Sequence, residues 1–125
     1  MRSGAVAEVS DLMTGDLIAV RPSDRAGRAL DILLESGLHA LPIIDADAVP
    51  VGLVTLADLV PIDRDLLVGD RFCGPPLTVD QAALTSEAAS LMRREYVHHL
   101  IVTDGETAVG MLSSHDLLKT LADED

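Results

Sequence analysis

The chain of 125 residues is 48% hydrophobic, but with one Phe, one Tyr and no Trp it lacks the aromatic platforms on which single-stranded nucleic acid stacks. Its formal net charge of −12 at pH 7 disfavours nonspecific attraction to nucleic acid or to anionic membrane surfaces. Cys73 is the only cysteine, which excludes an internal disulfide framework, and we expect it to pack as a small apolar residue. No apolar run approaches the ~20 residues of a membrane span, so we expect a soluble, cytoplasmic chain that binds neither nucleic acid nor membranes.

The first predicted helix lies within residues 22–37. Pro22-Ser23-Asp24 supplies a helix start, and Gly37 stops the helix as a C-terminal cap would. A short extended piece at residues 17–20 precedes it. Between these two signals, apolar residues recur at helical spacing: Ala29, Leu30, Leu33 and Leu34.

Two strands and a second helix are expected next. Residues 41–44 and 51–54 are short apolar runs, which are typical of strands, and residues 45–50 between them form a turn. A closing helix begins near Thr55. The first half of the chain therefore predicts one compact β-α-β-β-α unit.

The second half of the chain repeats the first, which indicates two copies of one supersecondary unit. The repeat predicts a helix at about residues 85–95, strands near 100–102 and 108–112, and a last helix after Ser113. Asp104-Gly105 is a hairpin signal between these two strands. With a shift of 59 residues, which becomes 58 beyond the shorter second turn, the following pairs align: Val9 with Val68, Val20 with Val79, Ala29 with Ala88, His39 with His98, Asp45 with Asp104, Gly52 with Gly110 and Asp58 with Asp116.

The most informative stretches are Gly52-Leu53-Val54-Thr55-Leu56-Ala57-Asp58 and Gly110-Met111-Leu112-Ser113-Ser114-His115-Asp116. In each, a glycine opens an apolar run, and a hydroxyl residue stands three positions before an aspartate. This pattern predicts a buried strand that runs directly into a helix, with Thr55 or Ser113 at the junction. It is also the pattern of a capping box with Asp in place of Glu.

With these motifs, the chain resembles a tandem pair of CBS domains, the regulatory unit called a Bateman module. The resemblance covers roughly residues 8–121 and rests on both glycine-to-aspartate stretches, on Val9-Ser10-Asp11-Leu12-Met13-Thr14 and on Leu38-His39-Ala40-Leu41-Pro42-Ile43-Ile44-Asp45. It implies an α/β (α+β) fold in which two β-α-β-β-α motifs pack as a pseudo-twofold pair. We expect the motifs at residues 8–60 and 68–121, joined by a connector at 61–67.

The resemblance also implies a ligand and an assembly. Similar pairs bind AMP, ADP, ATP or S-adenosylmethionine in a cleft between the two motifs, and they commonly form homodimers. The aspartate of the motif binds the ribose hydroxyls in such domains, which makes Asp58 and Asp116 the leading ligand-binding candidates. Thr55 and Ser113 are candidates for contacts with phosphate, and Ser114 is a candidate beside them. The alternative role of these side chains is helix capping alone.

Histidines stand where the predicted strands begin. In similar modules, a histidine followed by an arginine holds phosphate at this place. Here the histidine matches at His39 and His98, whereas Ala40 and His99 take the position of the arginine. The first copy has thus lost a basic group, which disfavours tight polyphosphate binding there. The alternative is that these histidines are partly exposed strand residues without a ligand.

The same strands supply the last candidates. In the family, backbone groups around a proline at the position of Pro42 meet the adenine ring, so Leu41, Pro42 and Leu100 are expected near adenine. The second copy has Ile101 in place of the proline, which suggests that the two binding sites are unequal. Ile101 can equally be an ordinary core residue of a strand.

We expect neither a metal site nor catalysis. His98 and His99 are neighbours on a strand and would point to opposite faces, so they cannot easily share one metal ion. No nucleophile–base relay, acid–base pair or glycine-rich phosphate loop is recognisable. A metal-dependent hydrolase is therefore strongly disfavoured.

One functional hypothesis and one rival follow. The first is a stand-alone regulatory module, not an enzyme, that binds an adenosine nucleotide and signals to an unidentified partner protein. The rival is a dimerising structural or interaction module without a small-molecule ligand. In the rival case, replacement of Asp58 or Asp116 would cost only the capping energy of about 1 kcal/mol.

Overall fold

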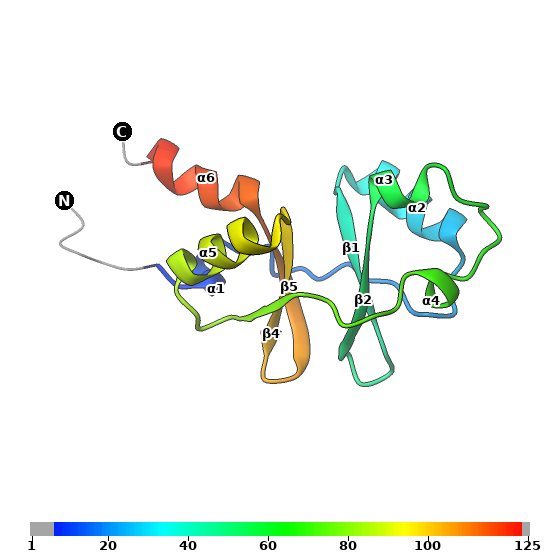
Figure 1. Cartoon of the computed structure of the whole chain (residues 1–125), viewed down its shortest axis with the longest axis horizontal. Coiled ribbons are helices and arrows are strands. Elements are labelled where there is room, and N and C mark those ends of the chain that lie inside the picture. The colour runs from blue at the N-terminus through cyan, green and yellow to red at the C-terminus, as the bar shows by residue number, and fades with distance from the viewer. Residues whose placement is uncertain (1–6, 124–125) are drawn as a thin grey trace. The chain divides into compact units, whose positions relative to one another are not determined.

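A computed structural model describes residues 7–123 of the chain. They form two compact units. The first-copy unit comprises residues 18–76 and 106–108, and the second-copy unit comprises residues 7–17, 77–105 and 109–123. Within each unit, a pair of strands packs beside helices that follow it and precede it in the sequence (Figure 1).

The first-copy unit is built on the antiparallel strands β1 (Ala40–Ile44) and β2 (Pro50–Thr55), in which Leu41 lies opposite Val54. Helices α2 (Ala26–Ser36) and α3 (Leu56–Leu59) pack against these strands and against each other. The short helix α4 (Val68–Arg71) belongs to the same unit. The fully buried core side chains include Val20, Leu33, Leu41, Ile43, Val54 and Leu59.

The second-copy unit contains a three-stranded sheet in the order β3-β4-β5. Strand β3 (Thr78–Asp80) runs parallel to β4 (His99–Asp104), and β5 (Thr107–Ser113) follows β4 through a turn in which Gly105 has a φ of +63°. Helices α5 (Thr85–Glu95) and α6 (Ser114–Asp123) pack together, and α1 (Val9–Leu12) completes the unit. Val9, Leu100, Val102 and Leu112 are fully buried in its core.

The element bounds confirm the repeat and the α/β fold class. Helices α2 and α5 both have 11 residues and begin at Ala26 and Thr85, a shift of 59. Helices α3 and α6 begin at Leu56 and Ser114, a shift of 58. The loss of one residue in the second turn therefore changes the numbering and leaves the order of the elements intact. The first strand of the first copy is reduced to one parallel bridge, between Val20 and Ile43.

The segments that lead into each copy pack with the other copy. Helix α4 precedes the second copy in sequence, yet the N–H of Val68 donates to the carbonyl of Asp24 in the first-copy unit at 2.9 Å. Helix α1 precedes the first copy, yet the N–H of Val9 donates to the carbonyl of Ala83 in the second-copy unit at 2.8 Å. We call residues 7–14 and 66–73 the lead-in segments. Apart from residues 106–108, each compact unit therefore consists of one copy and the lead-in segment of the other.

The C-terminal caps of α2 and α5 differ in residue type but not in conformation. Gly37 has a φ of +75°, which confirms the predicted glycine cap. Tyr96, its equivalent after α5, adopts the same left-handed conformation with a φ of +56°. A tyrosine in this region is uncommon because its Cβ crowds the backbone. Its side chain is 92% exposed, so little packing offsets this strain.

One helix begins slightly later than predicted, and two local expectations were wrong. Helix α2 begins two residues after Asp24, because the carboxylate of Asp24 accepts a hydrogen bond from the N–H of Arg21 (2.8 Å) and forms a turn before the helix. Leu34 ends the predicted apolar stripe but is 63% exposed. Cys73 is exposed, because it lies in the lead-in segment that pairs with Gly52 along the edge of β2.

Candidate functional site

The first candidate corner is the junction of β2 and α3. Thr55 is the N-cap of α3, and its hydroxyl accepts a hydrogen bond from the N–H of Asp58 at 3.2 Å. In return, the Asp58 Oδ2 accepts a hydrogen bond from the N–H of Thr55 at 3.0 Å. Asp58 is exposed and Thr55 is half-buried. The strand–helix junction thus holds the Asp58 carboxylate in a fixed orientation at the surface.

The second candidate corner is the junction of β5 and α6. The Ser113 hydroxyl accepts from the N–H of Asp116 at 3.1 Å, and the Asp116 Oδ2 accepts from the N–H of Ser113 at 2.8 Å. Asp116 differs from Asp58 in two respects. It is only 8% exposed, and its Oδ1 lies 3.5 Å from the Nζ of Lys119. The two corners therefore share their backbone geometry but not their electrostatics.

Both predicted capping boxes are confirmed, and they leave room for a second role. Capping uses Oδ2 of each aspartate. Among residues 7–123, Oδ1 of Asp58 has no hydrogen-bond partner, so this oxygen can accept from a ligand hydroxyl. The hydroxyls of Thr55 and Ser113 accept hydrogen bonds from the backbone and keep their own hydrogen to donate.

The two strand starts lie directly against these corners. The carbonyl of His39 accepts from the N–H of Leu56 at 3.0 Å, and the carbonyl of His98 accepts from the N–H of Ser114 at 2.8 Å. In the first copy, Ala40 also pairs with Thr55 across the strands. The structure therefore brings the predicted strand-start residues and the predicted corner residues together within each copy.

The residues expected near adenine are part of the cores. The side chains of Ala40, Leu41, Pro42 and Leu100 are buried, and Leu41 and Leu100 are fully inaccessible. The carbonyl of Pro42 accepts a hydrogen bond from the N–H of Val20 at 3.0 Å. Any contact between these residues and a ligand would therefore have to use the backbone of the strands.

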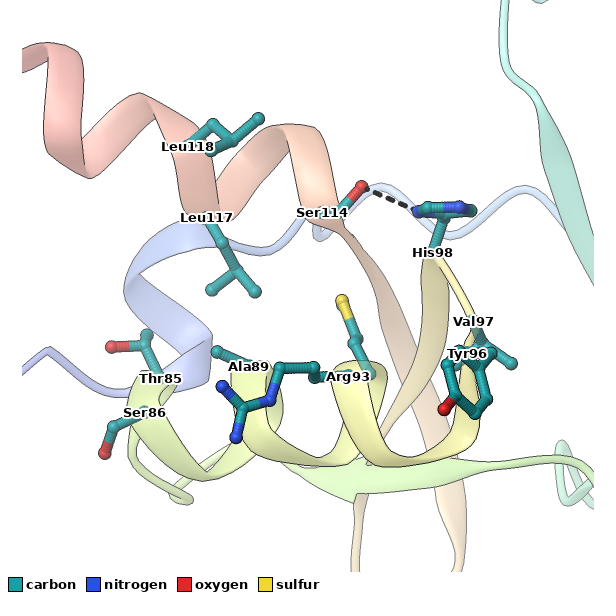
Figure 2. Close-up of a pocket in the computed structure, with 11 residues that line it drawn as sticks. Thr85, Ser86, Ala89, Arg93, Tyr96, Val97, His98, Ser114, Leu117 and Leu118 are labelled. Carbon is teal, nitrogen blue, oxygen red and sulfur yellow. Dashed lines mark hydrogen bonds between the residues drawn. The ribbon is translucent and has the colours of Figure 1, made fainter.

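The histidines of the second copy have separate environments. His98 is exposed, and its Nδ1 lies 3.4 Å from the Ser114 hydroxyl. A dashed line marks this hydrogen bond in Figure 2. His99 is half-buried at the first position of β4. Within the described part of the chain, no three His, Cys, Asp or Glu side chains lie close enough together to hold a metal ion.

A groove between α5 and α6 was not predicted from the sequence. It has a volume of about 800 Å³ and is lined by apolar side chains that include Met92, Val97, Leu117 and Leu118. Leu117 points from α6 into this groove (Figure 2). Arg93 and Tyr96 also line it. The sequence signal was the pair Leu117-Leu118, of which only the first packs on the core while the second is 58% exposed.

A second hollow, of about 420 Å³, lies beside α2 in the first-copy unit and contains Arg25, Arg28 and Arg64. The hydrogen bond and the charge of Asp31, 2.9 Å away, raise the pKa of the Arg64 guanidinium. Arg25 donates to the carbonyl of Asp65 at 2.8 Å. Arg28 lies 3.8 Å from Asp24, so each of these arginines is engaged with an acidic side chain or a carbonyl.

No helix within residues 7–123 is both long and apolar enough to cross a bilayer. Two known protein sequences are similar to this chain. It is 26% identical over 122 residues to inosine-5′-monophosphate dehydrogenase of Methanocaldococcus jannaschii, a match that covers 92% of this chain and 24% of that enzyme. It is also 26% identical over 154 residues to the chloroplastic CBS domain-containing protein CBSX1 of Arabidopsis thaliana, covering 94% of this chain and 65% of that protein. The chain spans between 24% and 32% of the length of the first two curated relatives.

Solved structures of two similar chains contain adenosine compounds. One is the crystal structure of CBSX2 in complex with AMP, whose chain is 28% identical to this one. The two structures have a TM-score of 0.84, and the match covers 93% of this chain and 96% of the CBSX2 chain. The other is the CBS domain pair of protein MJ0100 in complex with 5′-methylthioadenosine and S-adenosyl-L-methionine. It has a TM-score of 0.89 at 18% identity, and the match covers 97% of this chain and 100% of the MJ0100 chain. At this lower identity, the second likeness establishes the fold alone.

The family assignment follows from a match over most of the chain. A model of the CBS domain matches it twice, at residues 9–65 and 68–123. These two matches coincide with the two copies of the internal repeat. Each copy ends in a strand–helix corner at which the aspartate carboxylate forms part of a capping box. The chain therefore belongs to the CBS domain family and carries two CBS domains in tandem.

Proposed function

We propose that this chain is a regulatory module that binds an adenosine-containing nucleotide and signals its occupancy to a partner protein. The ligand would be AMP, ADP, ATP or S-adenosylmethionine. The observation that carries the proposal is the likeness to CBSX2, which covers 93% of this chain at 28% identity and whose crystal structure contains AMP.

In this proposal, the two aspartates bind ribose. The caps hold Asp58 and Asp116 through Oδ2, which leaves Oδ1 of Asp58 for the ribose hydroxyls, whereas Oδ1 of Asp116 lies 3.5 Å from the Nζ of Lys119 and would be shared with it. A carboxylate accepts strong hydrogen bonds from neutral hydroxyls, and a fixed carboxylate loses little entropy when it does so. The exposed position of Asp58 fits this role without rearrangement.

The remaining contacts would come from the same corners. Thr55 and Ser113 would donate their hydroxyl hydrogens to phosphate, and His39 or His98 would approach it from the strand starts. The backbone of β1 and β4 would meet adenine, because the side chains at those positions are buried. We further propose that the chain acts without catalysis. Ligand binding would then change the partner only through a difference in affinity between two conformations.

A thermal-shift titration tests the proposal. Protein stripped of nucleotide would be heated with AMP, ADP, ATP, S-adenosylmethionine or NAD. A ligand at a hundred times its dissociation constant adds about 2.7 kcal/mol of stability, a shift of several degrees for a domain of this size. We expect at least one adenosine ligand to produce this shift. The Asp58→Asn and Asp116→Asn variants would lose it in part or in full.

The matched control is Glu87→Gln. Glu87 also accepts a capping hydrogen bond, from the N–H of Leu84 at 3.1 Å, but it belongs to α5 and to neither corner. Like the two Asp→Asn variants, Glu87→Gln removes one negative charge and weakens a capping hydrogen bond. No shift with any ligand at millimolar concentration, or equal losses in all three variants, would contradict nucleotide binding at the corners.

The rival function, a dimerising module without a ligand, is favoured by exposed apolar side chains on the helices. Leu118 on α6 is 58% exposed, and its repeat equivalent Val60, which ends α3, is 64% exposed. Leu34 on α2 and Tyr96 after α5 are exposed as well. Leu118 and Tyr96 line the same groove, and an exposed apolar surface is typical of association sites. We propose that the chain forms a homodimer through these helix faces, whether or not it binds nucleotide.

The dimer is tested by light scattering over a dilution series. The double variant Val60→Glu and Leu118→Glu should be monomeric at concentrations where the wild type is dimeric, because two charges would be buried without partners. Ser90→Glu, at an exposed position of α5 that does not line the groove, is the control. A dimer that shows no ligand-induced shift would favour the rival function, whereas a wild-type monomer would contradict the dimer.

A further inference from the structure

Lys119 is the only lysine of the chain, and it lies at the second corner. Its Nζ is 3.5 Å from Oδ1 of Asp116, the carboxylate oxygen that capping leaves available. The Lys119 side chain is 60% exposed, whereas that of Asp116 is 12% exposed. The exposed ammonium group of Lys119 thus lies beside a carboxylate that the helix cap holds in place.

The first corner has no such cation. With the shift of 58, the equivalent of Lys119 is Pro61. Asp58 forms no ion pair with any residue of the described chain, 7–123. The two corners, which share the same capping geometry, therefore differ by one positive charge placed beside the carboxylate.

This difference decides how each corner would treat an anion. A phosphate brought near an uncompensated carboxylate is repelled, and the repulsion adds to that of a chain with a net charge of −12. Lys119 compensates the Asp116 carboxylate and can donate three hydrogen bonds. When a ribose hydroxyl donates to Oδ1 of Asp116, the flexible ammonium group can turn from the carboxylate to a phosphate of the same ligand.

We infer that Lys119 is a specificity-determining residue, which makes the Asp116 corner the site for an adenosine ligand that carries a phosphate. The Asp58 corner, where Thr55 and His39 act without a lysine, discriminates less between a nucleotide and a nucleoside. The inference rests on the proposed function and adds to it the chemical class of ligand at each corner. A purely structural role for Lys119, as an (i, i+3) ion pair on α6, would stabilise the helix only slightly. Such a role would not distinguish a nucleotide from a nucleoside.

Calorimetric titration of AMP and of adenosine tests the inference. The comparison uses Asp58→Asn protein, so that the Asp116 corner dominates binding. In this background, Lys119→Ala should weaken AMP binding about fivefold and leave adenosine binding within about twofold. Lys119→Arg, which keeps the charge, should restore most of the AMP affinity. Arg94→Ala is the matched control, because Arg94 has a similarly exposed side chain on the same unit and pairs with Glu95 at 3.7 Å.

The outcomes separate the inference from the function on which it rests. A loss confined to AMP, present in Lys119→Ala and absent in Arg94→Ala, supports the role of Lys119. Equal losses for AMP and adenosine in Lys119→Ala, or equal losses of AMP affinity in Lys119→Ala and Arg94→Ala, would overturn the inference while nucleotide binding stands. Failure of wild-type protein to bind either ligand would overturn the proposed function together with the inference.

Discussion

The backbone N–H of Ala26 donates a 2.7 Å hydrogen bond to the carbonyl of Leu66, which caps the start of α2 from a segment 40 residues further along the chain. No side chain caps this helix. The second copy repeats the arrangement, because the N–H of Thr85 donates to the carbonyl of Ala7 at 3.0 Å. The first N–H groups of a helix have no partner within the helix, so the lead-in segments supply a structural need that the local sequence does not meet.

The same lead-in segments explain the glycines that open the two signature stretches. A Cβ at Gly110 would lie 2.6 Å from the carbonyl oxygen of Thr14, and one at Gly52 would overlap the carbonyl oxygen of Phe72. Neither glycine has a positive φ, so the requirement is one of space rather than of backbone conformation. Each glycine is needed because the backbone of a lead-in segment passes too close to the strand to leave room for a Cβ.

Alanine at either of these glycines should therefore destabilise the chain. We expect Gly52→Ala and Gly110→Ala each to lower the free energy of unfolding by about 2 kcal/mol or more, since the clash is with backbone that cannot move aside cheaply. Urea denaturation measures the loss. Gly74→Ala is the control, because a Cβ there would meet nothing within 4 Å. Similar stability of all three variants would show that the lead-in segments do not hold their positions over the strands.

Replacement of the left-handed tyrosine should stabilise the protein. Tyr96 has a φ of +56° and is almost fully exposed, so Tyr96→Gly relieves backbone strain and loses little burial. We expect a gain of about 0.5–1 kcal/mol in thermal or urea unfolding of the ligand-free protein at low concentration. The reverse change at the equivalent position, Gly37→Ala, should destabilise by about 1 kcal/mol, although its Cβ would have open space. Opposite signs at the two positions are the expected result, and a loss in Tyr96→Gly would mean that the tyrosine side chain makes a stabilising contact.

Much of the fold could be predicted because the repeat supplies every local signal twice. The helix at residues 85–95 and the start of the last helix after Ser113 were placed correctly, since capping and apolar periodicity depend on neighbouring residues. The junctions at Thr55 and Ser113 were predicted for the same reason. The exchange of lead-in segments was not predicted, because it depends on backbone hydrogen bonds between residues 40 to 97 positions apart, such as Ala26 with Leu66 and Thr14 with Met111. Such bonds are made by any residue type and leave no pattern in the sequence.

The candidate site was predicted only in part, because burial and charge pairing are tertiary properties. Asp58 and Asp116 look equivalent in sequence, yet one is exposed and the other is buried beside Lys119. The sequence held a clue in the single lysine, which lies one helical turn after Asp116 and aligns with Pro61. The groove between α5 and α6 was missed, since the exposed Leu118 and the half-buried Leu117 are indistinguishable by hydropathy.

The unequal environments of the two aspartates predict unequal costs of removing them. In ligand-free protein, Asp58→Ala should lower the free energy of unfolding by about 1 kcal/mol, the usual cost of an exposed cap. Asp116→Ala should cost about 2 kcal/mol, because it leaves the half-buried N–H of Ser113 without an acceptor and Lys119 without its ion pair. Asparagine at either position can still accept the capping hydrogen bond and should recover part of each loss. Urea denaturation of the four variants makes the comparison. Equal costs at both corners would mean that burial and Lys119 contribute nothing to the Asp116 cap. The lysine would then be free of the carboxylate in solution, and its effect on ligand choice would have to arise from direct contact with phosphate alone.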